Sequence, residues 1–215
     1  MVDVRVMAVP KRREMVLALL DQLGLDETAV TYDDRPDGGY PYYTAKKAWL
    51  HELPKGATHR VVLQDDTEVC NDFIDLLTIC GRQFPQAVWS LFFSRNTVMH
   101  DETPYVKISP RGIYGLGVMM PKMLIAPCFK WIDRIYPDCK HDDSAFREFC
   151  HANKILTLTT APSLVQHIGD ESTLGHGSSK YLKSHVWVGE NLTGYNWDSK
   201  QYWKCKTSYS RAKPE

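Results

Sequence analysis

The chain has 215 residues, 43% of them hydrophobic and 24% charged, with a formal net charge of zero. This length suits one domain with a single buried core, and the composition excludes disordered and fibrous classes. The sequence contains no run of about 18 apolar residues, and its first basic cluster follows the opening apolar stretch, unlike a signal peptide. We therefore expect a cytoplasmic protein without a membrane partner.

The chain contains six cysteines, none of them in a C-x-x-C pair: Cys70, Cys80, Cys128, Cys139, Cys150 and Cys205. Their apolar or helix-like surroundings predict reduced thiols in a cytosol. The alternative is a zinc site, although the spacing differs from that of the usual structural zinc fingers. Its ligands would be Cys139, His141, Cys150 and His151.

Hydrophobic periodicity predicts strands that alternate with helices along the chain. The predicted strands are residues 4–9, 29–32, 59–64, 87–94, 115–120 and 155–160. The predicted helices are residues 12–23 ended by Gly24, 45–53, 71–80 ended by Gly81, one that begins at Pro121, and 145–152. This alternation predicts an α/β sandwich with a mostly parallel central sheet, in which ligands bind at the carboxyl ends of the strands.

Polar clusters follow three of the predicted strands, at residues 10–13, 33–35 and 65–68. The strongest feature is V-V-L-Q-D-D-T-E-V, residues 61–69, where Asp65 and Asp66 end a hydrophobic strand. Two adjacent carboxylates favour a cation, and Mg²⁺ or Mn²⁺ held by oxygen ligands stabilises the charge of a leaving diphosphate. An acidic turn that merely ends the strand is the alternative.

Two further segments contain residues suited to chemistry. His167 lies in a predicted loop, A-P-S-L-V-Q-H-I-G-D-E-S-T-L-G, where it could complete a carboxylate metal site or be an ordinary structural histidine. Asp142 and Asp143 precede a predicted helix, where either could cap the helix or act as a general base toward a hydroxyl group.

Together these segments resemble the GT-A glycosyltransferases, which transfer a sugar from a nucleotide diphosphate. The resemblance covers about residues 4–175. Its most specific stretch is P-S-L-V-Q-H-I-G, because a similar sequence occurs in N-acetylglucosaminyltransferases. Q-D-D matches the family's acidic D-x-D motif, with Gln64 in place of the first acid. The resemblance implies a Rossmann-like GT-A catalytic domain over residues 1–175 and an inverting, metal-dependent transfer, with UDP as the expected nucleotide.

The resemblance also implies a role for each matching residue. Arg12, Asp33 and, less directly, Lys47 would contact the donor; Asp65 would contact the ribose or the metal; Asp66 and His167 would bind Mn²⁺ or Mg²⁺; Asp143 or Asp142 would be the base.

The chain is most similar to compact glycosyltransferases of phages and actinobacteria, some of which glucosylate hydroxymethylated pyrimidines in DNA. Residues 176–215 form a predicted extension with seven basic and three acidic residues, which gives a local charge of +4. Its basic residues alternate with aromatic ones: Tyr181, Trp187, Tyr195, Trp197, Tyr202, Trp203 and Tyr209. Such a surface can stack bases and pair with phosphates, so DNA is one expected acceptor, beside a glycan, a small molecule or a protein.

Two other functions remain alternatives. A sugar-nucleotide-binding module with a decayed catalytic site would explain the missing first acid. A phosphoryl or nucleotidyl transferase would require a phosphate-binding glycine loop, and the sequence contains neither G-x-x-x-x-G-K-[ST] nor G-x-G-x-x-G.

Overall fold

The computed structural model describes residues 1–35, 40–93, 105–108, 113–169, 183, 184, 187 and 189, with the backbone alone for residues 105–108 and 161. The strands are β1 (Val2–Ala8), β2 (Val30–Tyr32), β3 (His59–Gln64), β4 (Thr67–Val69), β5 (Val88–Ser90), β6 (Tyr105–Ile108), β7 (Gly117–Pro121), β8 (Thr157–Ala161) and β9 (Val165–His167). The helices are α1 (Arg13–Leu23), α2 (Pro41–Leu50), α3 (Phe73–Gln83), α4 (Lys122–Ile135) and α5 (Asp142–Ala152), with short 3₁₀ turns η1 (Pro10–Arg12) and η2 (Glu27–Ala29).

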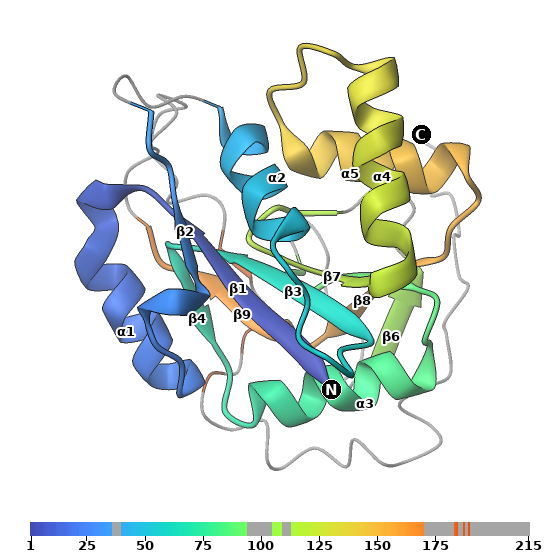
Figure 1. Cartoon of the computed structure of the whole chain (residues 1–215). Coiled ribbons are helices and arrows are strands. Elements are labelled where there is room, and N and C mark those ends of the chain that lie inside the picture. The colour runs from blue at the N-terminus through green and yellow to red at the C-terminus, as the bar shows by residue number, and fades with distance from the viewer. Residues whose placement is uncertain are drawn as a thin grey trace, which may run out of the picture.

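A seven-stranded sheet in the order β2-β1-β3-β7-β5-β8-β6 forms the centre of the molecule (Figure 1). β1 pairs in parallel with β2 and β3, and β5 pairs in parallel with β8. β7 runs antiparallel to both β3 and β5, and β6 runs antiparallel to β8. The sheet is therefore mixed, with most strands in one direction, which confirms the predicted α/β class and is compatible with a Rossmann-like fold.

Each face of the sheet packs against its own group of helices because alternate strand residues point to opposite faces. Val4, Val6 and Ala8 of β1 share one buried cluster with α1 and α3. Met7 of β1 and Val62 of β3 share the other cluster with α2, α4 and α5. Figure 1 shows α2, α4 and α5 grouped together over the sheet.

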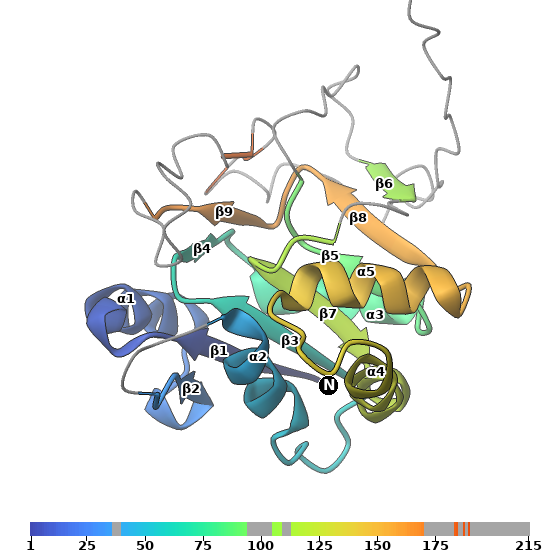
Figure 2. The same ribbon diagram turned by 90° about the horizontal axis from the view of Figure 1, so that it is seen from above.

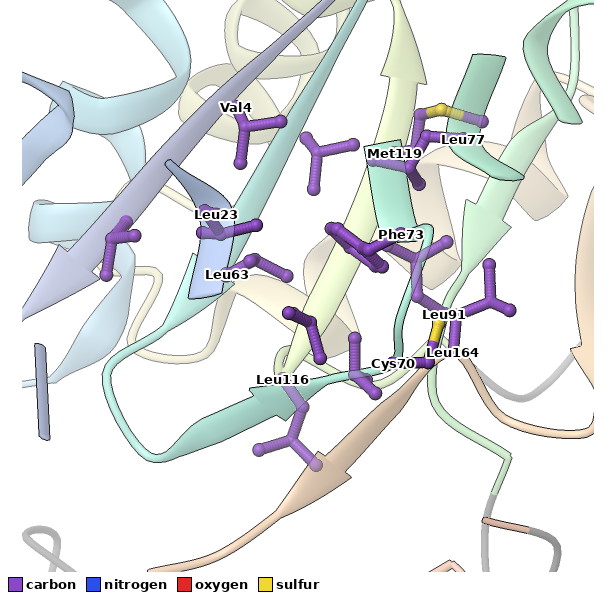
Figure 3. Packing of buried hydrophobic residues seen from close by; sticks show 14 of the residues in the cluster. Val4, Leu23, Leu63, Cys70, Phe73, Leu77, Leu91, Leu116, Met119 and Leu164 are labelled. Atoms are coloured by element: carbon purple, nitrogen blue, oxygen red, sulfur yellow. The ribbon is translucent and has the colours of Figure 1, made fainter. Parts of the chain in front are cut away.

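The first cluster joins distant parts of the chain into one core (Figure 3). Leu23 of α1 and Phe73 and Leu77 of α3 converge on Leu63 and Met119 of the sheet. Leu63, Leu77 and Met119 have no exposed surface. Burying side chains of this size contributes about 1.5–3 kcal/mol each to the free energy of unfolding. The core therefore fixes where the carboxyl ends of β1 and β3 lie.

A second, two-stranded sheet consists of β4 and β9, which run antiparallel and pair Thr67 with His167 and Val69 with Val165. Figure 2 shows the two strands side by side next to the central sheet. The sequence predicts neither strand, and it places His167 in a loop. Three-residue strands contain too little periodicity to be recognised before their partner is known. This small sheet determines the position of His167.

Several predicted element boundaries are wrong for local reasons. α2 begins at Pro41, in the first helical position that proline favours, and not at residue 45. Gly81 lies inside α3 and is not its terminal residue. A methyl group at Gly81 would lie 3.1 Å from the His59 ring, so close packing explains this glycine. Pro121 was predicted to be the first residue of a helix. It ends β7 and is the N-cap of α4, so the helix begins one residue later, at Lys122.

Candidate active site at the carboxyl ends of β1 and β3

The carboxylate pair Asp65 and Asp66 directly follows β3, and both residues are buried, with 5% and 6% of their surface exposed. The parallel register pairs Met7 with Gln64, so the chain leaves β1 beside Asp65. The Val9 N–H donates to Asp65 Oδ2 at 2.8 Å. Burial and the charge of Asp66 raise the pKa of Asp65, although the Val9 N–H and Arg12 oppose this effect. Two carboxylates are thus held in a site that water barely reaches.

Arg12, in η1 directly after β1, bridges the two carboxylates with one guanidinium nitrogen. Its Nη1 donates to Asp65 Oδ1 at 2.8 Å and to Asp66 Oδ2 at 2.6 Å. Burial disfavours a charged Asp66, but hydrogen bonds and charges from His167 and Arg12 outweigh it and lower the pKa of Asp66. Burial also opposes the charge on Arg12, and the two carboxylates raise the pKa of Arg12 above its usual value. The site therefore contains a buried, charge-assisted ion-pair triad.

His167 reaches the same carboxylate from β9. Its Nε2 lies 3.1 Å from Asp66 Oδ2, and the side chain is buried. Asp66 Oδ1 and His167 Nδ1 are buried, and neither atom has a hydrogen-bond partner among the residues that the structure describes. Buried polar atoms rarely lack partners, so two such atoms on adjacent side chains are suited to a ligand that supplies the missing contacts.

The chain after β9 passes directly over Asp66. The Ile168 N–H donates to the Asp66 carbonyl at 2.9 Å. A methyl group at Gly169 would lie 2.8 Å from Asp66 Oδ2 and 2.9 Å from its Cβ, too close for any real side chain. Glycine at this position therefore permits the close approach of the two segments. In the sequence, the glycine of H-I-G is the sign of this contact.

Asp142, the first residue of α5, is buried with 4% of its surface exposed. A methyl group at Gly115 would lie 2.8 Å from Gln64 Nε2 and 3.7 Å from Asp142 Oδ1, so both side chains border the same glycine. Burial and the charge of Asp143 raise the pKa of Asp142 to about 7. This carboxyl group can therefore both accept and release a proton near neutral pH. It lies near Gln64, the residue that precedes the carboxylate pair.

Asp143 differs from its neighbour, because its side chain is partly exposed and its Oδ1 accepts from the Ser144 N–H at 2.6 Å. The N-cap of α5 is His141, whose side chain makes no capping bond. Neither Asp142 nor Asp143 is therefore the N-cap, which was one interpretation of the sequence, because both lie inside the first turn, where Asp143 accepts from a backbone N–H. Their charges still lie at the positive end of the helix dipole.

The predicted donor contacts Asp33 and Lys47 lie further along the same end of the molecule. The Asp33 N–H donates to the Ala8 carbonyl at 2.8 Å, at the end of β1. Its buried carboxylate forms two bonds with Arg35, at 2.8 Å and 2.5 Å, and these bonds lower the pKa of Asp33. Lys47 is more exposed and pairs with Asp34 at 2.7 Å. Asp33 thus borders the carboxyl end of β1, whereas Lys47 lies on the outer surface of α2.

The structure brings Asp65, Asp66, Arg12 and His167 into direct contact. Within the described part of the chain, no group of three or more histidine, cysteine, aspartate or glutamate side chains is arranged to hold a metal ion. The zinc alternative built on Cys139 and Cys150 is therefore wrong. The five cysteines in the described ranges are free thiols.

Other sequence predictions are only partly covered by the structure. Most of the extension 176–215 lies outside the described residues, including every aromatic residue of its predicted surface except Trp187. Of the part that is described, Ser184 forms two backbone hydrogen bonds with the Gln166 side chain, at 2.8 Å and 3.1 Å. Trp187 packs against the first core cluster. None of the helices in the described ranges has the length and apolar character needed to cross a bilayer.

A cavity of about 400 Å³ lies between the end of α1, β4 and the start of α3, and Glu68, Asp72 and Trp187 are among its lining residues. The carboxylate pair and His167 do not line this cavity. The groups that can act chemically lie instead among the buried charged residues, Asp65, Asp66, Arg12 and His167.

No model of a known protein family matches the chain. No curated protein matches it with significant similarity.

Proposed function

We propose that this protein is a metal-dependent glycosyltransferase, which transfers a sugar from a nucleotide diphosphate donor to a hydroxyl acceptor. One observation is central to the proposal: a buried carboxylate pair meets His167 at the carboxyl end of β3, where ligands of α/β sheets bind. The mixed α/β sheet is compatible with a GT-A domain over residues 1–175.

Asp66 and His167 would hold the divalent ion, Mn²⁺ or Mg²⁺. The Asp66 carboxylate and the His167 imidazole, whose Nε2 lies 3.1 Å from Asp66 Oδ2, are donors of the kind these ions accept. Two protein ligands are sufficient, because such ions commonly bind through one or two carboxylates together with substrate phosphates and water. When bound, the ion would stabilise the negative charge of the leaving diphosphate.

The neighbouring charged residues would bind the donor. The Arg12 guanidinium has the planar geometry that suits phosphate oxygens, and it already lies among the buried charges. Asp33 and Asp65, near the ends of β1 and β3, would accept hydrogen bonds from donor hydroxyl groups, such as those of the ribose. Lys47 would contribute at longer range. These roles follow the family resemblance and the shared location.

Asp142 is the better candidate for the general base. A base that works near neutral pH needs a pKa close to 7, and burial gives Asp142 such a value. Its carboxylate would take the proton of the acceptor hydroxyl as that oxygen attacks the anomeric carbon. A single displacement of this kind inverts the anomeric configuration. Asp143, which is partly exposed, would remain outside the reaction.

The acceptor is the least constrained part of the proposal. DNA with a hydroxymethylated pyrimidine remains the acceptor that the basic, aromatic extension favours. Ser184, a described residue of the extension, contacts Gln166, which is next to His167. Binding to a modified duplex that weakens steeply with salt would agree with this acceptor. Transfer to a free nucleoside or an oligosaccharide, independent of salt, would contradict it.

One observation favours a second candidate, a sugar-nucleotide-binding module without catalysis. Arg12 pairs with both carboxylates, and Gln64 stands where the family motif has an acid. Such a module would bind the donor and leave it intact. A transferase usually loses some donor to water, so turnover separates the two functions.

The decisive experiment measures UDP release from a panel of UDP-sugars, with Mn²⁺ or with EDTA. We expect slow hydrolysis of at least one donor by the wild-type protein, and none in EDTA. The Asp66→Asn variant, shown to be folded by circular dichroism, should release no UDP. Equal release by this variant, or full activity in EDTA, would contradict the metal-dependent mechanism. Donor binding without any release would favour the binding module.

A further inference from the structure

Arg12 occupies the position of a counter-ion in the candidate site. Its Nη1 alone contacts Asp65 Oδ1 and Asp66 Oδ2, at 2.8 Å and 2.6 Å. The three side chains have 12%, 7% and 8% of their surface exposed, so little water screens these charges. The guanidinium thus neutralises the same oxygens that a divalent cation would neutralise.

A divalent ion on Asp66 would lie close to the Arg12 guanidinium. Asp66 Oδ2 already accepts from Arg12 and contacts His167 Nε2, and its Oδ1 has no hydrogen-bond partner among the described residues. Two cations within bonding distance of one buried carboxylate repel each other strongly. A divalent ion held by Asp66 and His167 therefore competes with the guanidinium.

Arg12 is placed to move from one partner to another. It ends the single 3₁₀ turn η1 and forms the N-cap of α1, so its long side chain begins at the carboxyl end of β1. A donor diphosphate bound at this end of the sheet would present oxygens that suit a planar guanidinium. The same side chain can therefore pair with carboxylates before binding and with phosphates after it.

We propose that Arg12 is an exchangeable counter-ion that couples metal binding to donor binding. It pairs with Asp65 and Asp66 in the free protein, and it moves to the donor diphosphate when a divalent ion binds Asp66. The proposal rests on the proposed function, since it assumes a nucleotide diphosphate and a metal at this site. Its consequence is positive cooperativity: each ligand favours the position of Arg12 that the other requires.

The test measures Mn²⁺ binding by electron paramagnetic resonance, with and without UDP, for the wild type, Arg12→Gln and Arg12→Lys. For the wild type we expect UDP to tighten Mn²⁺ binding by about 5–150-fold, the usual range of such coupling. Arg12→Gln removes the competing charge, so it should bind Mn²⁺ alone more tightly, by a factor in that range, and gain less from UDP than the wild type does. Arg12→Lys keeps the charge without the planar fork, so its Mn²⁺ affinity should resemble the wild type while the UDP effect shrinks.

Two results would overturn the proposal. One is equal or weaker Mn²⁺ binding by Arg12→Gln; the other is an undiminished UDP effect in both variants. If Arg12→Gln does not fold, Arg12→Lys and the wild type still decide, because an unchanged UDP effect in the lysine variant contradicts the role of the guanidinium. No step of this test uses sugar transfer. Cooperative binding without transfer would contradict only the proposed enzyme activity, and transfer without cooperativity would contradict only the role of Arg12.

Discussion

Asp142 is the residue at which function and stability oppose each other most directly. Burial and the charge of Asp143 raise its pKa to about 7, above the value of an unfolded aspartate. The unfolded chain therefore loses this proton at lower pH than the folded chain. As pH rises from about 4 to about 7, ionisation of this group increasingly favours unfolding.

We predict that Asp142→Asn lowers activity and raises stability. Loss of the base should reduce kcat by roughly 10²–10⁴-fold with little change in donor affinity. The free energy of unfolding should increase by on the order of 1–4 kcal/mol at pH 8, and by much less at pH 4.5. Urea unfolding at both pH values and UDP release measure the two effects.

Asp143→Asn is the matched control, because the same change occurs one position along α5 at a partly exposed side chain. It should alter the free energy of unfolding by less than about 1 kcal/mol and leave most of the activity. If Asp143→Asn abolishes activity while Asp142→Asn does not, the assignment of the base is wrong.

His59 gives a pH dependence of the opposite sign. Burial lowers its pKa, so the folded chain holds this ring neutral, while the unfolded chain takes up a proton near pH 6.5. The contribution of neutral His59 to the free energy of unfolding is therefore fully present above about pH 6.5, and it declines as the pH falls below this value. Urea unfolding at pH 7.5 and 5 should show a smaller loss for His59→Gln than for the wild type. Equal losses in the two proteins would show that His59 does not contribute.

At the scale of elements, the end of α1 depends on one backbone conformation. Gly24 has φ of 62°, and its N–H bonds back to the last turn of the helix. No atom lies within 4 Å of a methyl group placed there, so any cost of a side chain comes from the backbone alone. Glycine adopts this left-handed conformation without the penalty that other residues incur.

We predict that Gly24→Ala lowers the free energy of unfolding by about 1 kcal/mol, measured by urea denaturation. Gly24→Asn should cost less, because asparagine tolerates the left-handed region at helix ends. If the alanine variant is as stable as the wild type, the helix end must be able to adopt another conformation.

The elements also show what the sequence can and cannot predict. The buried strand β3 and the amphipathic helix α1 were predicted within a residue or two, because their periodicity is local. β7 lies within two residues of the predicted strand 115–120, but its antiparallel direction and the short β9 were not predicted, since both depend on pairing with residues far along the chain.

In the candidate site too, local features can be predicted from the sequence and long-range contacts cannot. The sequence selects Asp65, Asp66 and His167 by residue type, but it places His167 in a loop. It takes Arg12 as a donor contact and leaves Asp142 and Asp143 equal. Only the fold reveals the pair of Arg12 with the carboxylates and the burial of Asp142, because these contacts join residues distant in sequence. Gly115 and Gly169 were likewise not selected, because a glycine shows its role only through what lies against it.

At the scale of the whole molecule, two buried clusters hold the two faces of one sheet, and the charged site lies at the carboxyl ends of its strands. Buried charges are stable only when they are paired, and Arg12 and His167 provide the pairing in this site. A ligand that completes the site should therefore stabilise the entire domain, since it binds only the folded chain.

Thermal unfolding with a panel of nucleotide sugars tests the central claim most directly. A donor at about 100 times its Kd adds about 2.7 kcal/mol to stability, which for a chain of this length raises Tm by roughly 5–10 °C. We predict that at least one UDP-sugar produces such a rise in the wild type when Mn²⁺ is present, and that Asp66→Asn shows little or none. If no nucleotide sugar shifts Tm, or if Asp66→Asn shifts as far as the wild type, the carboxylate pair is not a sugar-nucleotide site.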